Sequence, residues 1–131
     1  MIEKILAAAT LGGILGLERE LRHKPAGVKT NAVVAIAACS FLLLADAVDP
    51  SEKVRIMTGI VQGVGFIGGG LILKEGPVAR GLTSAAAIWV SAALGLACGA
   101  GQWKLAVVVL LTTLLVLRGA RLFLRKDEEN T

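Results

Sequence analysis

The sequence predicts an all-α fold: a polytopic membrane bundle of about five transmembrane helices, with the N-terminus outside and the C-terminus in the cytosol. Three observations support this. First, 55% of the 131 residues are hydrophobic, against ~45 to 50% in soluble domains. Second, charged residues divide the chain into five apolar stretches. Third, the basic residues are unevenly placed between those stretches. So small a soluble fold could not bury this much apolar surface, which disfavours a soluble enzyme or disulfide scaffold.

The five stretches differ in how well they fit a bilayer. A spanning helix needs ~20 apolar residues. The third and fourth are long enough at once, the second is long enough with its flanks, and the first and fifth have only 13 uncharged residues each. They cover residues 5–17, 31–45, 56–73, 81–103 and 105–117. We expect one transmembrane domain over residues 1–124 and a charged cytosolic tail over 125–131. The first stretch is expected to be retained as a span, because its small residues lie inside the run and not after it.

Lys and Arg residues predict the orientation of these spans. With the N-terminus outside, the inner segments hold ten of the 14 basic residues and the outer segments hold four. Basic residues concentrate on the cytosolic side of bacterial membrane proteins, so this orientation is favoured. The charge balance, +4 overall, is therefore assigned to membrane topology and not to nucleic-acid binding. Trp103 is expected to lie at the outer membrane interface.

Sixteen glycines indicate close helix packing. GxxxG spacing lets helix backbones approach because side chains are absent. It occurs four times, at Gly12/Gly16, Gly59/Gly63, Gly65/Gly69 and Gly95/Gly99. We expect eight glycines to lie at helix–helix contacts: Gly12, Gly16, Gly59, Gly63, Gly65, Gly68, Gly69 and Gly70. We therefore expect a tight bundle.

A helical wheel of the third stretch gives a sharper expectation. Its glycines fall on two faces, while Ile60, Val64, Ile67 and Leu71 form a bulky stripe expected to meet lipid. The helix should then lie between two neighbours. Gln62 falls at the seam of the glycine faces, where its amide either bonds to a neighbouring helix or lines a path for a ligand or ion.

Polar residues cluster at the expected inner side. Glu18, Arg19 and Glu20 end the first stretch, and Arg80 and Thr83 introduce the fourth. One interpretation is a solvated collar that fixes topology. The other is a functional cluster in which the start of the fourth helix attracts an anion or one of these carboxylates. Thr83 or Ser84 is also a candidate cap for that helix.

On the expected outer side, acidic residues recur every three positions at Asp46, Asp49 and Glu52, beside Lys53 and Arg55. Oxygen ligands suit Mg²⁺, so a cation-sensing cluster is one interpretation, and an ion-paired loop is the other. No catalytic motif is present and the chain has one histidine, so we expect no enzymatic activity and no cofactor other than Mg²⁺ as ligand or signal.

Several linked motifs resemble the MgtC/SapB family of bacterial inner-membrane proteins, over roughly residues 10 to 103. They are GGILGLERE at 12–20, PAGVKT at 25–30, Asp49-Pro50 followed by Arg55-Ile56, IVQGVGFIGGG at 60–70, and VARGLTSAA at 78–86 with Trp89. The family's polar motif matches Glu18, Arg19, Glu20, Asp49, Arg55, Arg80 and Thr83. The segment between Asp49 and Arg55 is longer than in the family pattern, and the chain resembles a short form without the C-terminal cytosolic domain of many relatives.

The resemblance implies about five spans in the bacterial inner membrane and a role in adaptation to low magnesium. In pathogens it implies virulence through growth inside phagocytes. Some members of the family are thought to restrain the ATP synthase.

Three hypotheses follow. The first is a regulator that contacts another membrane complex, such as the ATP synthase, through its helices. The second is a small Mg²⁺ or proton transporter or channel, a homodimer lined by Gln62 and by Glu18 or Glu20. The third is a sensor that uses the outer acidic residues. The bilayer and a second copy of the chain are the expected partners in each case, without nucleic acid.

Overall fold

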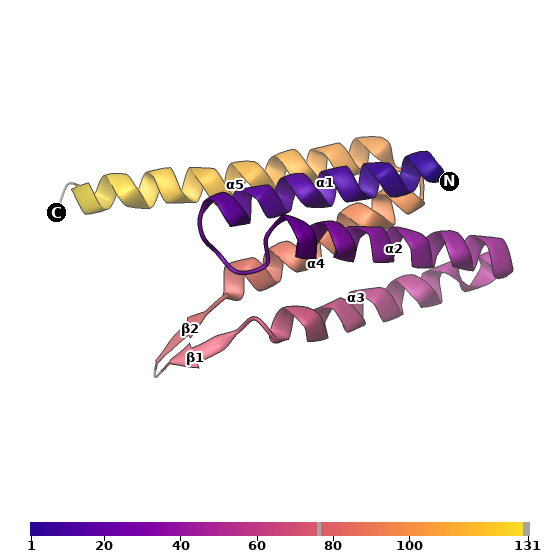
Figure 1. Cartoon of the computed structure of the whole chain (residues 1–131), viewed down its shortest axis with the longest axis horizontal. Helices are drawn as coiled ribbons and strands as arrows, with labels where there is room; N and C mark the ends of the chain where they lie inside the picture. Colours follow the sequence, from indigo (N-terminus) through magenta and orange to yellow (C-terminus); the bar gives the residue numbers. More distant parts are fainter. Residues whose placement is uncertain (76, 130–131) are drawn as a thin grey trace.

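The computed structural model describes residues 1–75 and 77–129, with the side chains of 73–75, 121 and 125–129 left aside. The described part contains five α-helices, a short 3-10 helix and one β-hairpin (Figure 1). In chain order the elements are α1 Ile2–Leu21, α2 Val28–Val48, η1 Pro50–Glu52, α3 Lys53–Gly69, β1 Leu73–Glu75, β2 Val78–Arg80, α4 Leu82–Gly99 and α5 Trp103–Glu129. Consecutive α-helices run in opposite directions, as Figure 1 shows, so the fold is an up-and-down helix bundle with a small hairpin that the sequence did not predict.

The core of the bundle lies between α1, α2 and α4. Leu15 of α1, Cys39 of α2 and Leu94 of α4 are fully buried there, and Cys39 and Cys98 are free thiols. The central helix is α4, because it contacts each of the other four α-helices. At the far end of the core, Lys4 Nζ donates a hydrogen bond to the carbonyl of Gly99, 3.3 Å away, at the C-terminus of α4.

Glycines set the spacing of these three helices. A Cβ atom placed on Gly12 would lie 2.7 Å from the Ala35 Cβ atom, and one on Gly95 would collide with the Ala35 carbonyl. Gly16 likewise faces the backbone of Gly27 and Val28. The α1, α2 and α4 backbones therefore approach too closely to admit a methyl group at these positions.

The orientation of α3 differs from the wheel-based expectation. Val64 is 8% exposed and packs with Ile88 of α4, with Ile60 and Leu71 beside them. The stripe expected to meet lipid thus faces inward, apart from Ile67, which is 49% exposed. Branched side chains fill the space against α4 and bury more apolar area than glycines could. The wheel separates the faces correctly but carries no information on which face turns toward the neighbours.

Three helices among the described residues are long and apolar enough to cross a membrane: α2, α4 and the Trp103–Leu124 part of α5. The fifth stretch, expected to be marginal, continues into this 27-residue helix, which also includes residues 125–129 of the expected tail. The third stretch, expected to span at once, forms only the 17 residues of α3, about 26 Å at ~1.5 Å per residue. It ends at Gly69, where the chain turns into the hairpin.

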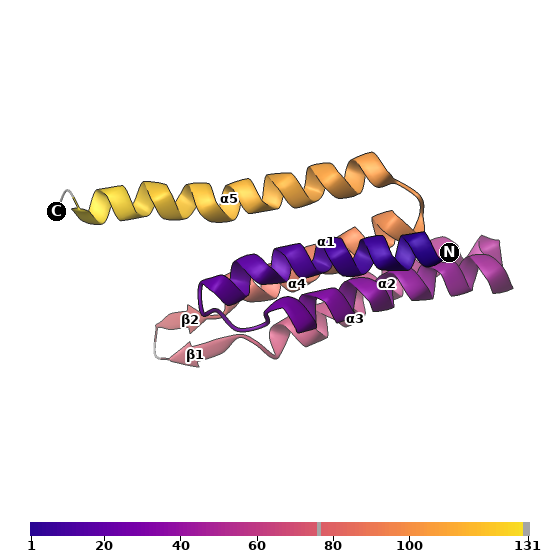
Figure 2. The same cartoon turned by 45° about the horizontal axis from the view of Figure 1, so that its top comes forward.

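The periphery of the bundle is less tightly joined than its core. Helix α3 lies along α4 and α2, whereas α5 packs mainly against α4 and α1 and stands apart in Figure 2. The hairpin pairs Leu73 with Arg80 and Glu75 with Val78 in antiparallel register. It lies at the same end of the molecule as the C-termini of α1 and α5 (Figure 1).

Candidate functional site

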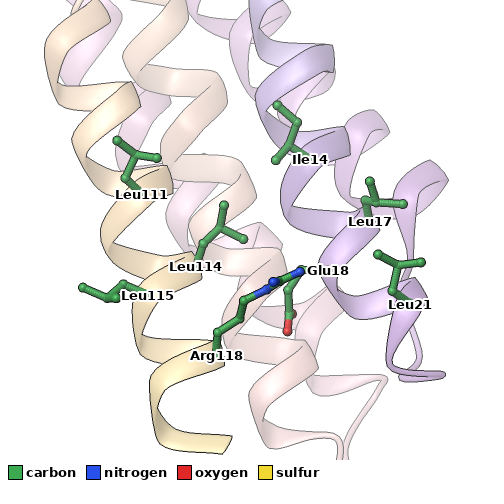
Figure 3. Close-up of a pocket in the computed structure, with 8 residues that line it drawn as sticks. All are labelled: Ile14, Leu17, Glu18, Leu21, Leu111, Leu114, Leu115 and Arg118. Atoms are coloured by element: carbon green, nitrogen blue, oxygen red, sulfur yellow. The ribbon is translucent and has the colours of Figure 1, made fainter. Parts of the chain in front are cut away.

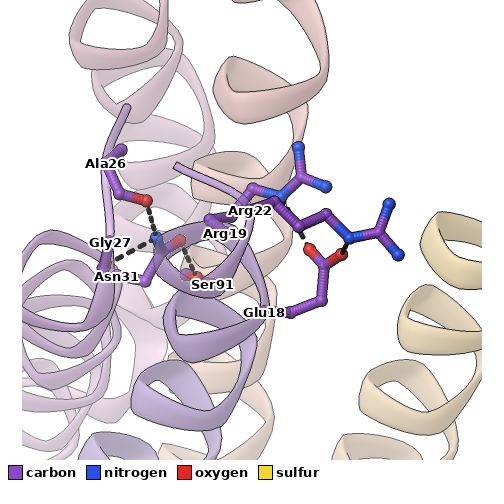
Figure 4. A network of polar contacts seen from close by, with 7 residues as sticks. All are labelled: Glu18, Arg19, Arg22, Ala26, Gly27, Asn31 and Ser91. Carbon is purple, nitrogen blue, oxygen red and sulfur yellow. Dashed lines mark hydrogen bonds and ion pairs between the residues drawn. The ribbon is translucent and has the colours of Figure 1, made fainter. Parts of the chain in front are cut away.

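A buried charge cluster occupies the end of α1. Glu18 and Arg19 are 4% and 3% exposed. Arg19 Nε donates a hydrogen bond to Glu18 Oε2 over 2.7 Å, and Arg22 Nε lies 2.6 Å from Glu18 Oε1, one helical turn away (Figure 4). Burial of charges is costly unless they are paired, and the two guanidinium groups offset part of the cost of burying the Glu18 side chain.

The two oxygens of Glu18 are not equally satisfied. Oε2 accepts the well-directed hydrogen bond from Arg19, but Oε1 is buried without a hydrogen bond of good geometry, although it forms the close ion pair with Arg22. Oε1 therefore keeps acceptor capacity beside the open space described next.

That space is a groove of about 430 Å³ between α1 and α5. Glu18 lies at its charged end, and the guanidinium of Arg118 on α5 points toward Glu18 (Figure 3). The rest of the lining is aliphatic: Ile14, Leu17, Leu21, Leu111, Leu114 and Leu115. The groove thus combines an apolar channel along two helices with a group of charges at one end.

Next to the cluster, a hydrogen-bond network connects three parts of the chain. Asn31 Nδ2 donates to the carbonyls of Ala26, at 2.8 Å, and Gly27, at 3.0 Å, while Ser91 Oγ of α4 donates to Asn31 Oδ1 over 2.7 Å (Figure 4). Asn31 and Ser91 are both fully buried. Sequence reasoning missed this pair. The available signal was a polar residue inside an apolar stretch on each helix, without anything to indicate that they meet.

The remaining members of the predicted polar cluster lie elsewhere. Glu20 accepts a weak hydrogen bond from the Val28 amide, 3.5 Å away, and thereby supports the start of α2. Arg80 is exposed on β2, and Thr83 lines a second groove, between α4 and α5. The structure therefore brings together Glu18 and Arg19 with Arg22, one helical turn after Glu18, and places Thr83 on a different surface.

The expected cap of α4 by Thr83 or Ser84 is wrong. The N-cap is Gly81, without a side-chain cap hydrogen bond. Its φ of 86° is in the left-handed region, and an added Cβ atom would collide with the Leu71 carbonyl. Only glycine fits this turn without strain. Because the turn lies at Gly81, the helix begins at Leu82, before Thr83 and Ser84, and Ser84 is buried within the first helical turn.

The outer acidic residues have separate partners. Asp46 pairs with Lys53 over 2.6 Å, and Glu52 with Arg55 over 3.7 Å. Asp49 accepts hydrogen bonds from the Ser51 hydroxyl, at 2.6 Å, and the Ser51 amide, at 3.1 Å, which lower the pKa of its carboxyl group. No group of three potential metal ligands occurs in the described residues. The loop has the ion-paired form, and Asp49 and Arg55 do not join in one site.

On α3, Gln62 is exposed and forms no hydrogen bond within the described part of the chain. Its neighbour Phe66 is 87% exposed. At four glycines of α3, a Cβ atom would have no neighbour within 4 Å among the described residues, apart from the adjacent backbone of α3 itself. These are Gly59, Gly63, Gly65 and Gly69. Unlike Gly12, Gly16 and Gly95, these four glycines face no other helix among the residues that the structure describes.

Comparison with known proteins gives consistent results. The model of the MgtC family matches residues 5–126. The chain is 43% identical over 122 residues to the protein MgtC of Salmonella typhimurium (strain LT2), which covers 91% of this chain and 53% of that protein. It is 46% identical over 98 residues to the protein MgtC of Brucella abortus (strain 2308), or 74% of this chain and 41% of that protein. The chain spans about half the length of these curated relatives, and no solved structure matches it.

Proposed function

This chain belongs to the MgtC family of membrane proteins, and from that premise we propose that it regulates membrane energetics or adaptation to low magnesium by contacting another membrane complex. The proposed location is the bacterial inner membrane, with the N-terminus outside. The ATP synthase is the complex that the family resemblance suggests. The chain acts in this proposal through helix contacts and not through catalysis.

One observation supports this mode of action above others: the open glycine face of α3. Gly59 and Gly63 are one turn apart, and neither has a neighbour within 4 Å of its Cβ position on another described element. Small residues allow an approaching helix to pack against the backbone, which is a main source of helix association in membranes. Gln62 lies beside this face with its amide available for an interhelical hydrogen bond, worth roughly 0.6 kcal/mol.

The test is co-purification after mild detergent extraction with a Gly63→Leu variant. Gly119→Leu on α5 is the matched control, because Gly119 also faces open space within the chain. We expect Gly63→Leu to lose the membrane partners that wild type retains, while Gly119→Leu keeps them. Equal recovery of those partners by all three proteins would contradict contact through this face.

A second candidate is a small Mg²⁺ or proton transporter or channel, assembled as a homodimer. The observation in its favour is Glu18, a carboxylate nearly inaccessible to solvent beside an open groove. The two arginines paired with it repel a divalent cation from this position, so the test uses proton flux. Proton flux into proteoliposomes above that of empty vesicles, abolished by Glu18→Gln in folded protein, would support this function; flux equal to empty vesicles would reject it.

A further inference from the structure

The groove between α1 and α5 has a graded chemistry along its length. Ile14 and Leu111 lie toward the middle of the bundle, and Glu18 and Arg118 lie toward the end where α1 stops (Figure 3). Its volume, about 430 Å³, lies in the range of ~300 to 1,000 Å³ typical of small-molecule sites. A ligand that fits must therefore be apolar along most of its length and polar at one end.

The charges at the polar end favour an anion. Glu18 is the one carboxylate that lines the groove, and it already pairs with Arg19 and Arg22. Arg118 adds a third guanidinium group, which is exposed and forms no ion pair in the described part of the chain. Among the residues that line the groove, Arg118 is the cationic one, and the charge of Glu18 is already balanced by its arginine partners. Guanidinium groups bind phosphate oxygens with two parallel hydrogen bonds, which makes Arg118 a suitable phosphate ligand.

We propose that this groove binds an anionic phospholipid. The phosphate binds at Arg118, and an acyl chain lies along the aliphatic walls supplied by Ile14 and Leu111. The acyl chain distinguishes the ligand from free phosphate, which would leave these walls uncovered. The anionic lipid is preferred to a zwitterionic lipid because its headgroup carries no cation. The ammonium group of a zwitterionic lipid would lie beside the guanidinium groups and be repelled by them. Basic sites between membrane helices are suited to such anionic headgroups.

The first test is native mass spectrometry of the full chain in mild detergent with dioleoylphosphatidylglycerol or dioleoylphosphatidylcholine. The wild type is expected to retain the anionic lipid preferentially. One basic residue near a membrane surface contributes ~1 kcal/mol, so Arg118→Ala should bind phosphatidylglycerol about fivefold more weakly. Lys104→Ala, which removes the same charge at the opposite end of α5, should bind as wild type does. Equal retention of the two lipids, or equal effects of the two variants, would overturn the proposal.

A second pair of variants tests the apolar walls without changing charge. Leu111→Trp fills the groove, and Val108→Trp places the same side chain on α5 at a position outside the groove with similar exposure, 59% against 60% for Leu111. Leu111→Trp should lose the bound phosphatidylglycerol, and Val108→Trp should keep it, with circular dichroism showing equal helix content. Displacement of the lipid by millimolar inorganic phosphate, or loss of lipid in both variants, would overturn the assignment of an acyl chain to these walls.

Discussion

The α1–α2–α4 core and helix α3 use glycine in opposite ways. In the core, Gly12 and Gly95 face neighbouring helices at distances that exclude a methyl group. On α3, Gly59 and Gly63 have the same GxxxG spacing as Gly12 and Gly16 of the core, but they face open space. The branched residues of α3 face inward instead. The same sequence pattern thus marks a completed interface in one region and an unoccupied surface in the other. Which one applies depends on the side chains that compete for the buried face.

The largest expected difference between core and periphery concerns ion pairs. Arg19→Ala removes a partner from Glu18 inside the core, and breaking a buried pair costs ~3 to 5 kcal/mol. Arg55→Ala removes an exposed partner from Glu52, worth below ~1 kcal/mol. Equilibrium unfolding in detergent, followed by circular dichroism, measures both. A similar loss of stability in the two variants would break the distinction between core and periphery.

Glycine substitutions test the comparison most directly. Gly95→Ala places a methyl group against the Ala35 carbonyl and should destabilise the bundle by ~1 to 3 kcal/mol through overpacking. Gly63→Ala places its methyl group in open space as far as the described residues extend, and it should stabilise the helix by up to ~1 kcal/mol because alanine has the higher helix propensity. Unfolding free energies measured for the isolated chain should therefore change in opposite directions. A loss of stability in Gly63→Ala would indicate that α3 already packs against another copy under those conditions.

Hydroxyl groups provide a third comparison. Ser91→Ala leaves the buried oxygen of Asn31 without its donor, at a cost of ~1 to 3 kcal/mol. Thr58→Val on α3 removes a hydroxyl that bonds only to Val54 of its own helix. The unfolding free energy of this second variant should remain close to that of wild type. An equally small effect of Ser91→Ala would show that the network contributes little to the core.

The smallest expected effect is the pH dependence of the turn before α3. The hydrogen bonds from Ser51 lower the pKa of Asp49 in the folded state, so this carboxylate stabilises the fold above its unfolded pKa, near 3.8. That contribution disappears as pH falls through the lower, folded pKa. Melting temperatures of wild type and Asp49→Asn should therefore differ slightly at neutral pH and converge in acid. A difference that grows on acidification would contradict the assignment.

Sequence alone predicted the five α-helices but not which side of each helix faces the bundle. The apolar stretches located all five, since burial of apolar residues and the spacing of charges are local signals. The lipid-facing side of α3 was wrong, because the inward position of Val64 depends on Ile88, which follows in α4. The hairpin was missed because its strands have only three residues each. Short strands carry little periodic signal.

The candidate site was predicted only in part, because sequence spacing indicates contacts within one helix but not contacts between helices. Glu18 and Arg22 are four residues apart on one helix, so their pairing follows from local geometry. The approach of Arg118 depends on the packing of α5 against α1, which local spacing does not specify. The Asn31–Ser91 hydrogen bond joins residues 60 positions apart and had no sequence signal beyond two polar side chains.

This long separation along the sequence affects how the bundle assembles while the protein is synthesised. Synthesis at ~5 to 20 residues per second delivers Ser91 about 3 to 12 s after Asn31. During that interval the side-chain Oδ1 atom of Asn31 lacks its hydroxyl donor, and the surface of α2 that later contacts Gly95 is uncovered. The α1–α2 pair therefore remains incompletely packed until α4 is synthesised, and the packing of α4 completes the core.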